Sequence, residues 1–182
     1  REEVEDITYM KWINVGETIT GMAIDPSPGQ RRLYWCVKGT NNVRDGKIFF
    51  AFLDDTSPEP YTYHLTGIPT GYLIDPKGLA IHTLEYRIYW TDIDVSDQGS
   101  YDNPVPVIRS ARLSDQQGVG QYYLDSTIDG HSTSSSALVD IAISYAVNNT
   151  AIVIDAGSPP AILAIPLNQS TLQDVFIDKG QG

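Results

Sequence analysis

A Tyr-Trp pair occurs twice in this chain, in residues 31–39 (RRLYWCVKG) and in residues 87–94 (RIYWTDID). A short apolar segment precedes each pair, at residues 21–25 (GMAID) and 78–82 (GLAIH). A motif that recurs together with its neighbours indicates an internal repeat. Such a repeat constrains the fold more strongly than any single residue.

Each Tyr-Trp segment is followed by two further segments rich in β-favouring residues. These are residues 47–53 and 61–65 in the first copy, and residues 107–113 and 121–125 in the second. Turn-forming residues separate the segments. Each copy is therefore predicted to contain four short strands.

A third copy keeps the rhythm without the Tyr-Trp pair, at residues 139–143, 151–155, 161–165 and 174–177. Before the first copy, residues 6–13 (DITYMKWI) indicate one more fourth strand. No segment shows a sustained period near 3.6 residues, so we expect an almost wholly β chain.

A small antiparallel sheet cannot bury both of its faces alone, and sheets stacked around an axis form a β-propeller. The sequence thus predicts an all-β fold: a partial β-propeller of about three four-stranded antiparallel blades plus one extra N-terminal strand. The predicted boundaries are 1–18 for the last strand of a preceding blade, and 19–68, 69–130 and 131–182 for the three blades.

Three blades make only an arc, which leaves two sheet faces uncovered. We expect the arc to belong to a six-bladed ring or a larger assembly. Either the rest of a longer polypeptide supplies further blades, or copies of the chain associate into a ring or a filament.

The segment GLAI at residues 78–81, followed by YWTD at residues 89–92, resembles the LDL-receptor class B, or YWTD, repeat. Six copies of that repeat close into an extracellular β-propeller. The first unit keeps Tyr34 and Trp35 but has Cys36 and Val37 in place of Thr and Asp, and the third keeps only the apolar pattern.

The motif residues are expected to be structural. Large flat rings on a second strand can fill the gap between neighbouring sheets. The rings in question are those of Tyr34, Trp35, Tyr89 and Trp90. The resemblance implies that Thr91 and Asp92 hydrogen-bond to backbone groups at the blade junction, and that this connection is lost where Cys36 and Val37 replace them.

Charge and composition exclude several classes of partner. The formal net charge is −11 and the pI about 4.4, which oppose nucleic acid and anionic lipid as partners. No stretch approaches the roughly 20 apolar residues that cross a bilayer. The one cysteine, Cys36, cannot form a disulfide within the chain and is expected to be buried.

Catalytic motifs are not found. The sequence has no GxSxG, P-loop, HExxH or paired CxxC motif. The histidines, His64, His82 and His131, are scattered, and His131 adjoins Ser132 in a loop where no rigid element would orient them as a catalytic pair. We therefore expect no enzyme and no cofactor.

Calcium is the one metal that the sequence leaves open. The acidic loop that begins at Asp92 and continues through Asp94 and Asp97 supplies alternating oxygen side chains around Gly99. Its glycine and its twelfth residue do not fit the EF-hand template, so a solvated acidic loop is the preferred interpretation.

Two N-glycosylation motifs, at Asn148 and Asn168, follow a predicted first strand and a predicted third strand. Alternating strands bring these two loops to the same rim, while the longest insertions fall on the opposite rim. Loops carry binding function more often than the scaffold does, so the elaborated rim is the expected contact surface.

Two functions remain open from the sequence. The preferred one is a non-catalytic, extracellular or cell-surface module for protein–protein contact, or a structural unit of a larger glycoprotein or filament. The alternative is a calcium-dependent, lactonase-like propeller enzyme, for which Asp25, Asp140 and Asp155 are the carboxylates near inner strands.

Overall fold

The structure, a computed structural model, describes residues 17–27, 31–39, 45–54, 63–65, 68, 73–94, 105–113, 120–123, 137–144, 150–167 and 175–178. These ranges contain twelve β-strands and no helix. The strands form three antiparallel sheets, each built from four strands that are consecutive in the chain.

The first sheet, here called sheet 1, consists of β1 (Ile19–Asp25), β2 (Arg32–Val37), β3 (Lys47–Phe52) and β4 (Tyr63–His64). Sheet 2 consists of β5 (Leu79–His82), β6 (Arg87–Asp94), β7 (Val105–Arg112) and β8 (Gly120–Tyr123). Sheet 3 consists of β9 (Leu138–Ser144), β10 (Thr150–Asp155), β11 (Ala161–Pro166) and β12 (Val175–Asp178). In each sheet the strand order follows the chain order, so the sheets are open.

The prediction of an all-β chain with three antiparallel sheets is confirmed. β1 begins two residues before the predicted residue 21. Of the predicted strand at residues 61–65, the described residues include β4 at Tyr63–His64. The predicted N-terminal strand at residues 6–13 lies outside the described residues.

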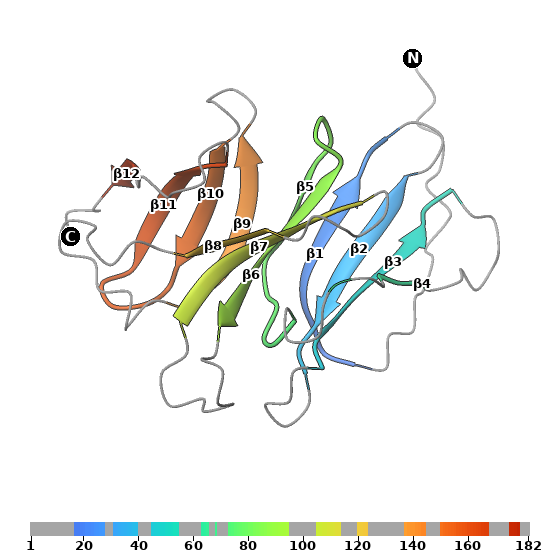
Figure 1. Cartoon of the computed structure of the whole chain (residues 1–182), viewed down its shortest axis with the longest axis horizontal. Coiled ribbons are helices and arrows are strands. Elements are labelled where there is room, and N and C mark those ends of the chain that lie inside the picture. Colours follow the sequence, from blue (N-terminus) through green and yellow to red (C-terminus); the bar gives the residue numbers. More distant parts are fainter. Residues whose placement is uncertain are drawn as a thin grey trace, which may run out of the picture.

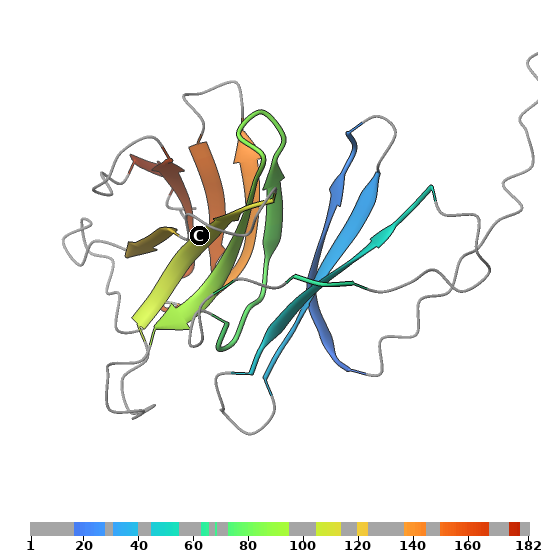
Figure 2. The same ribbon diagram turned by 45° about the vertical axis from the view of Figure 1, so that its right-hand side comes forward.

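Sheet 2 lies between the other two sheets (Figure 1). Its first strand, β5, contacts β1 of sheet 1 on one side and β9 of sheet 3 on the other. Figure 2 shows the sheets as separate layers, with sheet 1 in blue and teal standing apart from the green strands of sheet 2. The three first strands therefore run next to one another along the line where the layers come closest.

Two glycines permit this close approach of the first strands. A Cβ atom on Gly21 would lie 1.9 Å from the Lys77 carbonyl oxygen, and one on Gly78 would lie 2.4 Å from the Asp140 Cα atom. Both obstacles are backbone, which cannot move aside without moving a strand. The glycines that open GMAID and GLAIH are thus required by contact between sheets.

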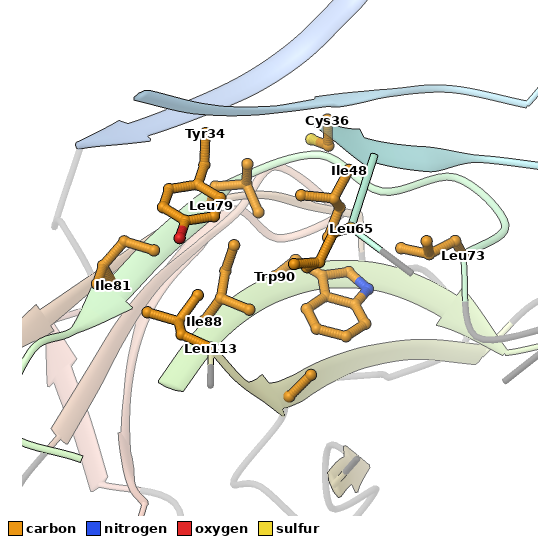
Figure 3. Packing of buried hydrophobic residues seen from close by; sticks show 11 residues of the cluster. Tyr34, Cys36, Ile48, Leu65, Leu73, Leu79, Ile81, Ile88, Trp90 and Leu113 are labelled. Carbon is orange, nitrogen blue, oxygen red and sulfur yellow. The ribbon is translucent and has the colours of Figure 1, made fainter. Parts of the chain in front are cut away.

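The core consists of three clusters, two of which fill the gaps between sheets. The cluster between sheets 1 and 2 is shown in Figure 3, where Tyr34 of β2 lies beside Leu79 and Ile81 of β5. The cluster between sheets 2 and 3 joins Tyr89 to residues such as Val153. The third cluster covers the face of sheet 1 that points away from sheet 2 and centres on Trp35.

Candidate functional site at the sheet junctions

The two residues of each Tyr-Trp pair point to opposite faces of their strand, because successive side chains alternate across a sheet. Tyr34 packs toward sheet 2 and Tyr89 toward sheet 3, while Trp90 packs back toward sheet 1. Trp35 stacks on Phe49 on the outer face of sheet 1, with ring centroids 5.8 Å apart. Three of the four rings fill gaps between described sheets. Among the described residues, the buried cluster around Trp35 contains only residues of sheet 1, so its place in a gap between two sheets stays a prediction.

Asp92 holds the end of β6 against the segment that leads into β5. Its Oδ1 accepts hydrogen bonds from the backbone N–H groups of Asp75 (2.7 Å) and Ile93 (2.8 Å), and its Oδ2 accepts one from the N–H of Ile74 (3.2 Å). The indole N–H of Trp90 also donates to Oδ2, at 3.3 Å. The bonding that the YWTD resemblance implied for Asp92 is therefore present.

A buried ion pair completes the Asp92 environment. The Arg109 guanidinium on β7 donates to Asp92 Oδ2 at 3.1 Å, and both side chains are withdrawn from solvent. Burial raises the pKa of the Asp92 carboxyl, while Arg109 and the backbone N–H donors act to lower it. The two oxygens of this carboxylate accept five hydrogen bonds, three from backbone N–H groups and two from the side chains of Trp90 and Arg109. Its role is therefore structural.

Thr91 closes the same junction from the other face of β6. Its Oγ1 accepts a hydrogen bond from the Gly78 N–H at 3.0 Å. Backbone bonds extend the pairing, from the Lys77 N–H to the Thr91 carbonyl and from the Thr91 N–H to the Gly78 carbonyl. Thr91 thus fixes the point at which the chain enters β5.

Sheet 3 repeats the Asp92 junction with a residue that the sequence did not single out for this role. Asp155 is the last residue of β10 and is fully buried. It lies at the repeat position that Asp92 occupies in β6. Its Oδ1 accepts from the N–H groups of Ala137 (2.6 Å) and Gly157 (2.8 Å). Ala137 precedes Asp140 by three residues, as Asp75 precedes Gly78 by three, so the third copy retains the Asp of the motif.

Sheet 1 makes its junction with sheet 2 by a different chemistry. The Cys36 thiol, at the position of Thr91, donates to the Lys77 carbonyl, and Thr20 Oγ1 donates to the Pro76 carbonyl at 2.5 Å. The expectation that Cys36 leaves this junction without a polar connection is wrong, because the thiol and a hydroxyl from β1 supply one. Burial raises the pKa of the Cys36 thiol to about 12.

Val37 occupies in sheet 1 the position that Asp92 occupies in sheet 2, and its side chain offers no hydrogen-bond acceptor to Trp35. The Trp35 indole N–H is buried and has no hydrogen-bond partner in the part of the chain that the structure describes. Trp90 donates to Asp92 at the equivalent place. The missing carboxylate therefore leaves Trp35 with an unmet donor.

The last residue of each of the segments GMAID and GLAIH stabilises the turn that follows the first strand of its sheet. Asp25 accepts hydrogen bonds from both the backbone N–H and the hydroxyl of Ser27. His82, at the same position in sheet 2, is fully buried and accepts the Glu85 N–H through Nδ1 at 3.1 Å. His82 thus stabilises the turn after β5 from within the core.

Of the three calcium candidates, only Asp92 has a described side chain. Asp92 points into the core toward Arg109, so it has no free oxygen to offer to a cation. The side chain of Asp94 and all of Asp97 lie outside the described residues. Within the described ranges, no group of three or more His, Cys, Asp or Glu side chains could hold a metal ion.

The carboxylates considered for a lactonase-like ring are each engaged locally. Asp25 binds Ser27, Asp155 binds Ala137 and Gly157, and Asp140 is exposed and accepts the N–H of Ile141. These three described carboxylates do not form a group that could hold a metal ion.

The two glycosylation acceptors, Asn148 and Asn168, lie outside the described residues, but the strand ends beside them are described. Thr150, the first residue of β10, pairs with Ser144 of β9 and with Pro166 of β11. The two connections that carry Asn148 and Asn168 thus start at the same end of sheet 3. His131, the side chain of His64 and much of the three longest loops fall outside the described residues.

No protein-family model matches the chain, and no curated protein matches it. In the described ranges, no helix has the length and apolar character needed to cross a membrane.

Proposed function

We propose that this chain is part of a YWTD-type β-propeller and serves as a non-catalytic extracellular module, either for protein–protein contact or as a structural unit of a larger glycoprotein. The polar groups at its sheet junctions bind backbone, which favours a scaffold over a catalyst. The acidic charge of −11 favours protein partners over nucleic acid.

The observation that carries the proposal is the recurrence of one junction in two sheets. Asp92 binds the N–H of Asp75 and Asp155 binds the N–H of Ala137, in each case three residues before the same repeat position. Sheets with equivalent junctions, stacked with their first strands adjacent, are the arrangement that a propeller repeats around its axis.

The test of the extracellular role is production of the chain through a eukaryotic secretory pathway. We expect secretion of a folded glycoprotein whose mass falls on enzymatic removal of N-glycans. The variants Asn148→Gln and Asn168→Gln should each remove part of that mass, and the double variant all of it. Intracellular retention of a misfolded, unglycosylated chain would argue against an extracellular module.

Calorimetric titration with calcium separates the proposal from the lactonase-like alternative. We expect no heat of binding beyond dilution, since the buried carboxylates are bonded to backbone. A tight single calcium site, together with calcium-dependent hydrolysis of a lactone, would replace the proposed function with the enzymatic one.

A further inference from the structure

Apolar side chains are exposed on the two outer faces of the sheet stack. Seven large hydrophobic residues of the described chain are exposed, and two of these, Leu84 and Tyr86, lie in the β5–β6 turn. The other five lie in β1 of sheet 1 or on the β10–β11 pair of sheet 3. They are Ile19, Met22, Ile24, Ile154 and Ile162.

The outer face of sheet 1 carries the residue pattern that sheet 2 presents to sheet 1. Met22 and Ile24 of β1 hold the positions of Leu79 and Ile81 of β5. In sheet 2 these positions are only 4% and 8% exposed, whereas Met22 is 61% and Ile24 57% exposed. The face is therefore built like a covered one, yet its first strand remains open to solvent.

Trp35 lies on the same face. It holds the position of Trp90, which packs against sheet 1. The residue is only 1% exposed, so the surface open to a partner on this face is that of β1, at Met22 and Ile24.

The outer face of sheet 3 carries the complementary pattern. Ile154 lies opposite Asp140 and Ile162, so the three side chains share the face that points away from sheet 2. Ile154 corresponds to Cys36, which sheet 1 packs against the start of β5. On its outer face, sheet 3 thus has the apolar residues Ile154 and Ile162, and this face corresponds to the one by which sheet 1 contacts sheet 2.

We infer that copies of this chain associate head to tail, the outer face of sheet 3 in one copy packing on the outer face of sheet 1 in the next. The contact continues the one that joins sheet 1 to sheet 2 and sheet 2 to sheet 3. It is heterologous, so it either closes into a ring or extends into a filament. The inference rests on the proposed role as an interaction module and names its partner as a second copy.

Asp140 limits how closely the two copies can approach. It holds the position of Gly21 and Gly78, where a Cβ atom would meet the next first strand at 1.9 Å and 2.4 Å. The Asp140 side chain is exposed on the outer face of sheet 3. Contact between copies is therefore looser at the first strands than contact within one copy, and the association is correspondingly weaker.

The experiment measures the mass of the full chain by light scattering and sedimentation, over a concentration range centred on about 10 µM. We expect a concentration-dependent multiple of the 20.1 kDa monomer. Ile24→Glu on sheet 1 and Ile154→Glu on sheet 3 should each abolish the association. An equal mixture of these two variants should form a dimer and nothing larger, because each retains the face that the other has lost.

Asp140→Gly tests the limit set by this residue. It should lower the dissociation constant about tenfold, whereas Asp140→Ala, which removes the charge but keeps Cβ, should change it less. The control is Leu84→Glu, in the turn and 77% exposed, which should associate like the parent chain. Circular dichroism melts establish that every variant is folded.

A parent chain that stays monomeric across the whole range would overturn the inference, as would undiminished association of Ile24→Glu or a mixture of the two variants that remains monomeric. Any of these results would leave the glycoprotein module of the proposed function standing with a different partner. Secretion and calcium titration test that function separately.

Discussion

The Asp92 carboxylate and the Arg109 guanidinium lie 3.1 Å apart in the middle sheet, with side-chain exposures of 0% and 1%. Removal of one partner from a buried pair leaves an uncompensated charge, which costs about 3–5 kcal/mol. Because Asp92 also holds three backbone N–H groups, we expect Asp92→Ala to cost more unfolding free energy than Arg109→Met. Urea titration measures both values. The exposed Arg31–Asp54 pair is the control, and Arg31→Ala should change the urea midpoint little.

We expect Asp155 to contribute to stability, although no Tyr-Trp pair precedes it in the sequence of its own copy. Asp155→Ala leaves the N–H groups of Ala137 and Gly157 without their buried acceptor, so we expect a loss of about 2–3 kcal/mol by urea unfolding. The matched control is Asp140→Ala, an exposed aspartate in the same sheet, which should change the free energy of unfolding by less than about 0.5 kcal/mol. Equal effects of the two substitutions would contradict the junction role of Asp155.

The glycines between first strands should tolerate no side chain. We expect Gly21→Ala and Gly78→Ala each to destabilise the chain by about 3 kcal/mol or more, because the added Cβ meets backbone of the next sheet. Gly46→Ala is the graded comparison, since its added Cβ would meet Pro76 Cδ at 2.8 Å, and it should cost less. The measurement is the thermal midpoint, and a Gly78→Ala chain as stable as the parent would show that the sheets do not approach as described.

Cys36 should be inert in the folded protein. Its thiol is buried and its pKa is raised from 9.0 to about 12, so at pH 8 it should react with a thiol reagent only on unfolding in urea. A Leu84→Cys variant, exposed in the turn, supplies a fast-reacting internal control. Rapid labelling of Cys36 in the native parent chain would contradict its placement between sheets 1 and 2.

The same pKa shift predicts how stability depends on alkaline pH. The Cys36 thiol ionises near pH 9 in the unfolded chain and near pH 12 in the folded chain. Its contribution to the free energy of unfolding is therefore complete below pH 9 and is lost as the pH rises toward 12. A Cys36→Ala variant should be less stable at pH 8 but should show a shallower loss between pH 9 and pH 11. Urea midpoints measured at each pH provide the comparison.

Much of this arrangement could be predicted from residue pattern. β-Branched and aromatic segments between turn formers predicted the strands, and the recurrence of Tyr-Trp predicted that they group into sheets of four. The opposite directions of Tyr34 and Trp35 follow from the alternation of side chains along a strand, which the sequence already contains. The prediction treated the two rings of a pair alike, although this alternation places them on opposite faces of the strand.

The junction chemistry could not be predicted in the same way. Asp155 follows an Ile-Val-Ile run that shares no letters with Tyr-Trp-Thr, so only its bonds to Ala137 and Gly157 show that it corresponds to Asp92. The bond between Cys36 and the Lys77 carbonyl joins residues 41 positions apart and depends on how two sheets approach each other. No local pattern specifies such a distance.

By itself, the sequence determined the β class, the grouping of strands and the apolar positions of each strand, because these depend on propensity and on a period of two residues. Only the tertiary structure decided that Asp92 and Arg109 share a buried pair and that Gly21 and Gly78 are contact points. It also decided that apolar side chains of β1 and of the β10–β11 pair stay exposed. Those outcomes depend on contacts between sheets, where the position of one backbone fixes the space left for the next.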